Sequence, residues 1–213
     1  MLLHDILHFF GRAICHQFEE RSLQVSGEAL AVCARDTGIY IGIFSTLIYL
    51  HFSKRGKSIT IPSIKISILL LLFLLPLMVD GLGSYTHLFE SNNIRRLMTG
   101  IAFGFVLPYF IYPLLSKESL DNKSEPVLKV RNDLYLPLLI SCIIGGLVYF
   151  GKVPLLLLNS VMILTIILWF SLLASFLFSN NKQAFKWTRS ILFSISSLSI
   201  LSIIHSWISS LTI

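Results

Sequence analysis

The fold is decided by the stretch between residues 153 and 178, which reads VPLLLLNSVMILTIILWFSLLASFLF and contains no charged side chain. A helix needs about 20 mostly apolar residues to cross the hydrocarbon core of a bilayer, so this stretch is long enough to span a membrane. Five further stretches are predicted to span it as well, at residues 37–53, 62–82, 97–116, 134–151 and 190–211. The sequence therefore predicts an all-α integral membrane protein with about six transmembrane helices.

The composition of the whole chain agrees with this class. Of the 213 residues, 54% are hydrophobic and 13% are charged, whereas soluble domains usually carry about 25% charged residues. These values exclude a soluble globular domain, a disordered chain and a nucleic-acid-binding domain. The chain also has only three cysteines, too few for a disulfide-rich scaffold. Its net charge of +6 comes from basic residues placed between apolar runs, which indicates membrane topology rather than nucleic-acid binding.

The distribution of Lys and Arg predicts the orientation in the cell membrane. The N-terminal segment and the second and fourth loops carry 6 basic residues, whereas the first, third and fifth loops carry 11. Because cytoplasmic loops are enriched in Lys and Arg, both termini are predicted to lie on the non-cytoplasmic side. The connectors at 51–61, 116–133 and 179–189 are typical of solvated loops.

Residues 1–36 are predicted to form an N-terminal polar segment at the membrane surface, and residues 37–213 the six-helix transmembrane domain. The first ten residues, MLLHDILHFF, alternate apolar and polar side chains with helical spacing, which is typical of a short interfacial helix. His4 and His8, spaced i, i+4, are expected to lie on its polar face. Residues 1–14 lack a basic region and a small-residue cleavage site, so no secretory signal peptide is expected.

A first group of candidate site residues lies between residues 15 and 36. Cys15 with His16, and Cys33 with Asp36, form two ligand pairs separated by a short loop, a common arrangement in tetrahedral zinc sites. Arg35 is close enough to favour the thiolate form that binds metal. Three other interpretations remain open: the cysteines form a disulfide, they only pack, or Asp36 simply favours the start of a helix.

A second group lies between residues 80 and 104, on the same predicted side of the membrane. Asp80 sits at or just inside the membrane boundary, where a carboxylate needs a partner. Asn92 and Asn93 are good N-caps for the next helix, and Arg95 and Arg96 in its first turn favour binding of a phosphate or carboxylate. The alternative is that Asp80 pairs with one of these arginines and locks two spans together. Glycines at 38, 42, 100 and 104 are predicted to bring the two helices that carry these groups close together.

These motifs resemble a family of small polytopic prokaryotic membrane proteins catalogued as a domain of unknown function. Its pattern CHQ…RS…CARCTGIY is similar to Cys15-His16-Gln17, Arg21-Ser22 and the run from Cys33 to Tyr40, and the following Asp-Gly and SNN-x-R-x-x-TG resemble residues 80–81 and 91–100. In this chain Asp36 replaces the second Cys of CARC. The resemblance covers about residues 15–104 and implies a membrane fold with an ordered polar site, but it implies no particular activity.

Together these observations predict an outward-facing polar site that acts on an anionic, phosphorylated lipid or lipid-linked substrate. In this hypothesis Cys15, His16, Cys33 and Asp36 hold zinc, and Asp80 is the catalytic base. The substrate-binding residues are expected to be Arg35, Asn92, Asn93, Arg95 and Arg96. The expected partners are the lipid bilayer and an anionic head group. Two other classes remain open: a transporter, and a scaffold or accessory protein whose polar cluster is structural.

Overall fold

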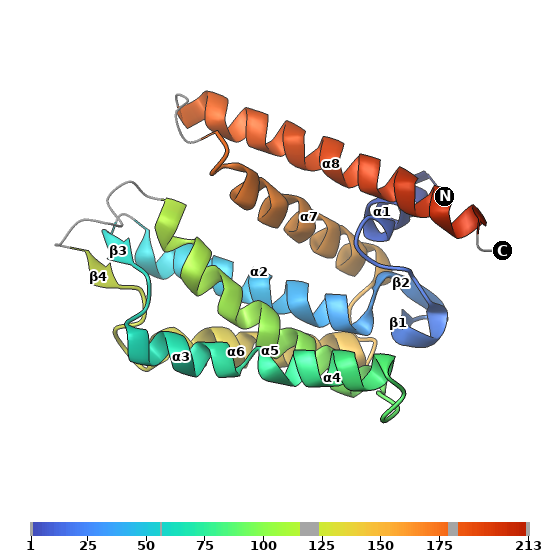
Figure 1. The fold of residues 1–213 in the computed structure, drawn as a ribbon, viewed down its shortest axis with the longest axis horizontal. Helices are drawn as coiled ribbons and strands as arrows, with labels where there is room; N and C mark the ends of the chain where they lie inside the picture. Colours follow the sequence, from blue (N-terminus) through green and yellow to red (C-terminus); the bar gives the residue numbers. More distant parts are fainter. Residues whose placement is uncertain (1, 56, 116–123, 179–182, 212–213) are drawn as a thin grey trace. The chain divides into compact units, whose positions relative to one another are not determined.

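The computed structural model describes residues 2–55, 57–115, 124–178 and 183–211 (Figure 1). The chain divides into two compact units. Unit 1 combines Met1–Cys33 with Gly151–Ile213, and unit 2 is Ala34–Phe150. The helices and strands of unit 1 are α1 (Leu2–Arg12), the 3-10 helix η1 (Glu19–Arg21), β1 (Ser22–Val25), β2 (Glu28–Cys33), α7 (Leu155–Ala174) and α8 (Gln183–Leu211). Those of unit 2 are α2 (Ala34–Lys54), β3 (Ile59–Thr60), α3 (Ile64–Leu72), α4 (Leu75–Tyr85), α5 (Asn93–Ile111), the 3-10 helix η2 (Pro113–Leu115), β4 (Glu125–Pro126) and α6 (Asn132–Tyr149).

Unit 1 joins the two ends of the sequence around a small hairpin. Strands β1 and β2 pair antiparallel, and both residues of their connecting turn, Ser26 and Gly27, have positive φ, as in the tight turns that match the twist of a hairpin. The backbone N–H of Ala31 in β2 donates to Oδ1 of Asn159 in α7 at 3.0 Å. The α8 residue Ser202 donates to the carbonyl of Phe9 in α1 at 2.6 Å. These bonds fix the N-terminal helix and the hairpin against α7 and α8.

The N-terminal polar segment predicted from the sequence is thus partly strand. The expected helix is present as α1, and it leaves the apolar side chains of Leu2, Leu3 and Ile6 exposed. The sequence did not predict the hairpin that follows, β1 paired with β2.

Unit 2 is built on the close pairing of α2 with α5. A Cβ atom added to Gly38 or Gly42 would meet the backbone of α5 at Leu97 or Phe105, and one added to Gly100 or Gly104 would meet the α2 carbonyls of Arg35 or Ile39. The absence of side chains at these positions lets the two backbones approach. The packing predicted from the two Gly-x-x-x-Gly motifs is therefore confirmed.

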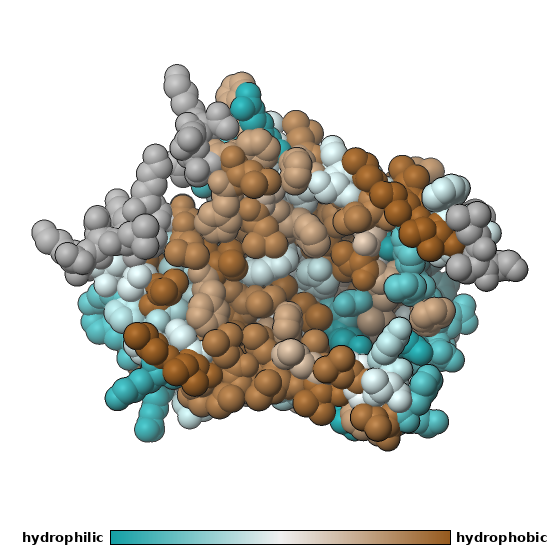
Figure 2. Space-filling view, viewed as in Figure 1, coloured by the Kyte–Doolittle hydropathy of each residue, from teal (hydrophilic) through white to brown (hydrophobic). Residues whose placement is uncertain are grey.

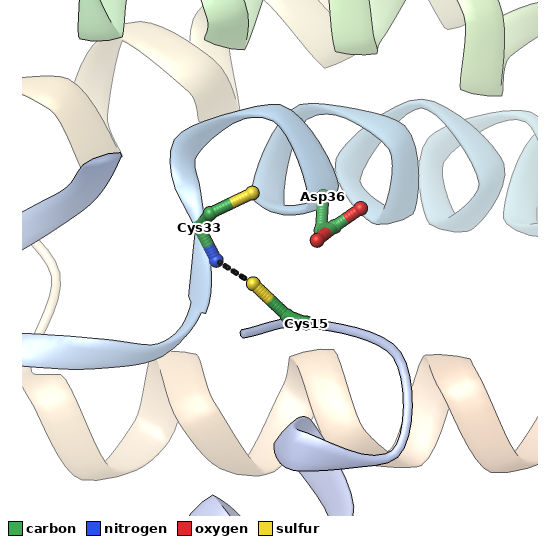
Figure 3. A group of neighbouring side chains, drawn as sticks. All are labelled: Cys15, Cys33 and Asp36. Carbon is green, nitrogen blue, oxygen red and sulfur yellow. Dashed lines mark hydrogen bonds between the residues drawn. The ribbon is translucent and has the colours of Figure 1, made fainter. Parts of the chain in front are cut away.

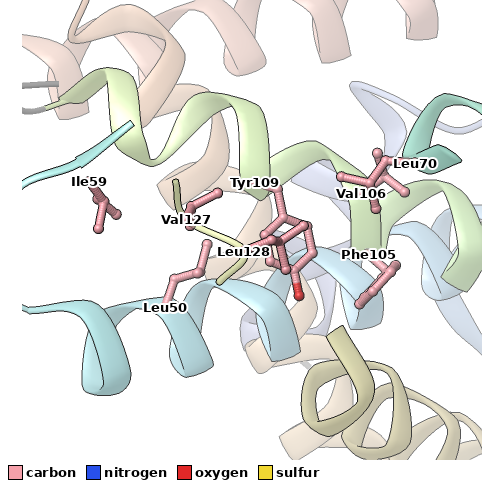
Figure 4. Close-up of a cluster of buried hydrophobic side chains, with 8 residues drawn as sticks. All are labelled: Leu50, Ile59, Leu70, Phe105, Val106, Tyr109, Val127 and Leu128. Atoms are coloured by element: carbon pink, nitrogen blue, oxygen red, sulfur yellow. The ribbon is translucent and has the colours of Figure 1, made fainter. Parts of the chain in front are cut away.

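A buried apolar cluster lies at one end of the α2–α5 pair (Figure 4). Phe105 and Tyr109 of α5 meet edge to face, with ring centroids 5.4 Å apart. The short parallel pairing of β3 with β4 brings in Ile59 and the chain beyond β4 brings in Val127. The cluster thus joins the two connecting segments of unit 2 to its helices.

The described residues include five helical segments that are long and apolar enough to cross a membrane, namely Ile64–Tyr85, Asn93–Leu115, Asn132–Tyr149, Leu155–Ala174 and Phe185–Ser210. They correspond to five of the six predicted spans. The predicted span 37–53 lies in α2, which is helical over 21 residues but does not meet the same criterion. The reason is its polar content, since Thr37, Ser45 and Thr46 are buried within it and charged residues stand at both of its ends.

The segment Ile64–Tyr85 is interrupted. It consists of α3 and α4, which meet at Phe73 and Leu74, and Pro76 lies in the first turn of α4. Proline lacks the N–H needed to continue the ladder of helical hydrogen bonds, which accounts for the break. Figure 2 shows an apolar surface over α3 and α4, where Ile64, Ile68 and Leu82 are each more than half exposed. Such a continuous apolar face is expected where a helix borders lipid.

Candidate functional site: a buried carboxylate and its arginines

The centre of the candidate site in unit 2 is the carboxylate of Asp80, whose side chain is fully buried. Its Oδ2 accepts a hydrogen bond from the Arg35 guanidinium at 2.5 Å. Its Oδ1 accepts one from the Ser91 hydroxyl at 2.6 Å and lies 3.0 Å from Nε of Arg95. Both oxygens are therefore engaged, and a carboxylate that would be costly to bury alone is compensated by two cations and a hydroxyl.

Each partner of Asp80 comes from a different part of the sequence. Arg35 lies on the first turn of α2, Asp80 lies in α4, and Ser91 precedes α5. Arg95 lies on the first turn of α5, where the side chain of Asn92 caps the helix by accepting the Arg95 backbone N–H at 2.8 Å. The Arg95 guanidinium also lies 4.1 Å from the ring centroid of Phe89. The pairing of Asp80 with an arginine, one of the two interpretations left open by the sequence, is present in the structure.

The two arginines keep part of their hydrogen-bonding capacity. Among the described residues, the buried Nε of Arg35 has no hydrogen-bond partner. The side chains of Arg35 and Arg95 are 26% and 44% exposed, so neither is sealed off by Asp80. Two guanidinium groups beside one carboxylate leave an excess positive charge.

The remaining predicted anion-binding residues lie on the same turn of α5. The Arg96 guanidinium donates to Oδ1 of Asn93 at 3.3 Å, so Asn93 acts on Arg96 while Asn92 caps the helix. Both asparagines thus have local roles that hold the start of α5 and its arginines in place.

Cys15 and Cys33 lie together within unit 1. The sulfur of Cys15 accepts the backbone N–H of Cys33 at 3.1 Å and that of Gln17 at 3.5 Å. Cys15 is buried, and no disulfide joins the two residues. Asp36 stands three residues beyond Cys33, on the first turn of α2, and Figure 3 shows the three side chains as neighbours. Their ligand atoms lie within 4.8 Å of one another.

This group brings together three of the four residues that the sequence proposed as metal ligands. The fourth, His16, stacks on Phe18 and meets the ring of His205 edge to face, with centroids 5.8 and 4.5 Å apart. Nδ1 of His205 is in turn hydrogen-bonded with the carbonyl of Arg12 at 2.8 Å. His16 therefore belongs to a histidine and aromatic cluster of unit 1 rather than to the cysteine group.

A second buried ion pair was not anticipated from the sequence. Asp133 is almost fully buried and is bound by the Lys54 amine at 2.8 Å and the Tyr49 hydroxyl at 2.7 Å. Its Oδ2 also accepts the backbone N–H groups of Lys129 and Val130, each at 3.0 Å. The interpretation of 51–61 and 116–133 as purely solvated connectors is therefore wrong at Lys54 and Asp133, while residues 116–123 and 179–182 lie outside the described residues. The one available signal was an acidic residue directly before the predicted span 134–151.

Comparison with known proteins places most of this site within a recognised region. Residues 15–110 match the family described as "Predicted membrane protein (DUF2085)". An uncharacterized protein of Methanocaldococcus jannaschii is 38% identical over 101 residues, which cover 47% of this chain and 63% of that protein. An uncharacterized protein of Methanothermobacter thermautotrophicus is 35% identical over 97 residues, which cover 45% of this chain and 82% of that protein.

No solved structure matches the chain. The aligned region spans less than two thirds of the first relative but most of the second. The region that matches the family, residues 15–110, includes the cysteine group, Asp80 and both of its arginines. The chain is a membrane protein and belongs to this family.

Proposed function

We propose that this membrane protein binds an anionic ligand, of the kind carried by a phosphorylated lipid head group, on Arg35 and Arg95. The observation that carries the proposal is the arrangement around Asp80: one buried carboxylate holds two partly exposed guanidinium groups, and the Nε of Arg35 lacks a partner among the described residues. Guanidinium groups bind phosphate and carboxylate through paired hydrogen bonds.

In this proposal Asp80 is a positioning residue. Both of its oxygens are already occupied by Ser91, Arg35 and Arg95, so its role is to hold the two cations at a fixed separation rather than to accept a proton. Arg96 adds a further positive charge on the same turn of α5. The proposal therefore concerns binding and assigns no reaction.

Lipid binding to the purified chain in detergent tests this directly. Native mass spectrometry would compare a short-chain phosphatidic acid with a phosphatidylcholine of the same acyl length, with inorganic phosphate as competitor. We expect the phosphatidic acid to bind more tightly, and Arg95→Gln to weaken its binding about tenfold, since one charge-assisted hydrogen bond contributes about 1.5–3 kcal/mol. Competition by phosphate would show that the phosphate group itself is recognised.

The matched control is Arg131→Gln, because Arg131 is an exposed arginine at the start of α6 in the same unit. It should bind phosphatidic acid as the parent chain does. Equal affinity for the two lipids, or an unchanged affinity in Arg95→Gln, would contradict the proposal. Arg95→Lys keeps the charge but not the planar fork. Its affinity for phosphatidic acid should therefore lie between that of the parent chain and that of Arg95→Gln.

The Cys15 and Cys33 pair supports a second candidate function, binding of zinc. The Cys15 sulfur lies beside the backbone of Cys33, whose N–H it accepts, and Asp36 is close enough along the chain to supply an oxygen ligand. Zinc binds at about 2.3 Å to sulfur and 2.0–2.2 Å to carboxylate oxygen, so donor atoms within 4.8 Å of one another need only small side-chain adjustments. Three protein ligands would leave a fourth position open.

Cobalt substitution tests this candidate, because a thiolate bound to Co²⁺ gives a sulfur-to-metal charge-transfer band. We expect the band in the parent chain and in Cys142→Ser, whose cysteine is exposed on α6. Cys33→Ser and Cys15→Ser should lose it. A parent chain without the band, or a band that survives both substitutions, would refute zinc binding here.

A further inference from the structure

A cleft of about 600 Å³ lies within unit 1, between α1 and the β1–β2 hairpin. Its size is that of an ordinary small-ligand site. The residues that line it are His4, Asp5, His8, Glu19, Gln24, Gly27, Glu28 and Ala29. None belongs to the Asp80 cluster or to the cysteine group.

The chemistry of the cleft is unusually rich in metal-ligand side chains. His4 and His8 are spaced i, i+4 on α1, which places both imidazoles on one face of the helix. Their rings stack with centroids 4.2 Å apart. Nε2 of His4 lies 3.9 Å from Oε2 of Glu28, which begins β2 just after the hairpin turn.

One of the residues that line the cleft has a ligand atom without a partner among the described residues. The Nε2 of His8 is buried and makes no hydrogen bond among the described residues. A buried polar atom in this state costs free energy unless something binds it.

The charge of the cleft fits a cation. Three carboxylates line it, on Asp5, Glu19 and Glu28, and its lining includes neither lysine nor arginine. Imidazole ligands favour a transition metal over Ca²⁺ or Mg²⁺, which prefer oxygen alone. His4 is 41% exposed and Glu28 65% exposed, so both side chains have room to turn toward a shared ion.

We propose that this cleft binds a divalent transition-metal ion through His4, His8 and Glu28. The two histidines supply nitrogen from adjacent turns of one helix, and the hairpin supplies the carboxylate. This site is independent of the anion and zinc proposals above, because it shares no residue with them.

Copper binding to the 213-residue chain tests the proposal in a Cys15→Ser/Cys33→Ser background, which removes both thiols. Electron paramagnetic resonance of bound Cu²⁺ should show hyperfine coupling to two imidazole nitrogens at one equivalent of metal. His8→Ala should lose this two-nitrogen signal. His51→Ala, a histidine near the end of α2, should leave it unchanged.

Glu28→Gln separates loss of binding from loss of folding, because Glu28 is an exposed residue at the edge of the hairpin. It should keep the unfolding midpoint of the parent chain and weaken Cu²⁺ affinity about tenfold, the lower end of what loss of a single metal-site interaction costs. A parent chain that binds no stoichiometric Cu²⁺ would overturn the proposal. So would a two-nitrogen signal that persists in His8→Ala, or an affinity unaffected by Glu28→Gln.

Discussion

Asp80 links three segments of unit 2 to α4: the start of α2, the chain just before α5, and the start of α5. Its carboxylate has no solvent exposure, and it draws Arg35, Ser91 and Arg95 to one point from separate places in the sequence. Removing its charge would leave two guanidinium groups facing one another without compensation. Like charges in such a setting repel, and the desolvation of a buried pair is no longer offset.

Asp80→Asn should therefore destabilise the protein by about 3 kcal/mol, the lower end for breaking a buried ion pair, because both arginines are partly exposed. Reversible unfolding in mixed detergent micelles measures this. Glu90→Gln, in the exposed segment just before Ser91, is the matched control and should unfold like the parent chain. Equal stability of Asp80→Asn and the parent would show that the ion pairs contribute nothing net.

Asp133 holds the other buried ion pair of unit 2 and offers a comparison. Lys54 and Asp133 are 11% and 6% exposed at their side chains, so this pair is more fully buried than the Asp80 pairs. Asp133→Asn should destabilise the protein by about 3–5 kcal/mol in the same measurement. Glu125→Gln breaks the exposed pair of Glu125 with Lys129 and should leave the stability nearly unchanged. A similar effect of both substitutions would mean that burial is not what gives the Asp133 pair its strength.

At the scale of elements, the pairing of α2 with α5 brings the candidate site together. Arg35 begins the first helix and Arg95 begins the second, and the glycines along both allow their backbones to touch. The spacing of the two arginines therefore depends on how closely these two helices pack.

Gly104→Ala should destabilise the protein by about 1–3 kcal/mol or more, because a new methyl group would meet the Ile39 carbonyl and force the helices apart. It should also weaken binding of phosphatidic acid, since Arg35 and Arg95 would separate. Gly146→Ala in α6 is the control: its added Cβ would have open space around it, and alanine favours helix by about 1 kcal/mol over glycine. If the two variants were equally stable, the close approach of α2 to α5 would be refuted.

At the scale of the whole molecule, the orientation in the membrane depends on α2. Its 21 residues extend about 30 Å, enough to cross the hydrocarbon core. If α2 crosses with the five apolar helical segments, the number of crossings is even and the two termini share one side.

Epitope tags at residues 1 and 213 should therefore both be accessible to protease on intact cells, as the excess of basic residues in the opposite loops predicts. A tag inserted after Lys57, in the basic loop that follows α2, should be protected and serves as the control. Termini found on opposite sides would show that one of the six helical segments does not cross. We would expect that segment to be α2, because it is not among the five apolar segments.

The sequence by itself determined the class of the protein, most of its spans and the residue types of its candidate site. Long uncharged apolar runs can be satisfied only in lipid, so the spans at 62–82, 97–116, 134–151, 153–178 and 190–211 follow from local composition. The Gly-x-x-x-Gly motifs likewise predicted the α2–α5 contact, because small residues at that spacing have one common use between helices. Neither inference requires knowing where distant residues lie.

Only the tertiary structure decided which polar residues meet. Arg35, rather than only Arg95 or Arg96, binds Asp80, and Lys54 finds Asp133 from 79 positions away along the chain. His16 contacts His205 instead of the cysteines, and the Nε2 of His8 is buried without a hydrogen-bond partner among the described residues. The residues that flank a charged side chain or an imidazole in the sequence do not show which partner it will contact in the fold. That partner is fixed by helix packing and by the cost of burying a charge unpaired.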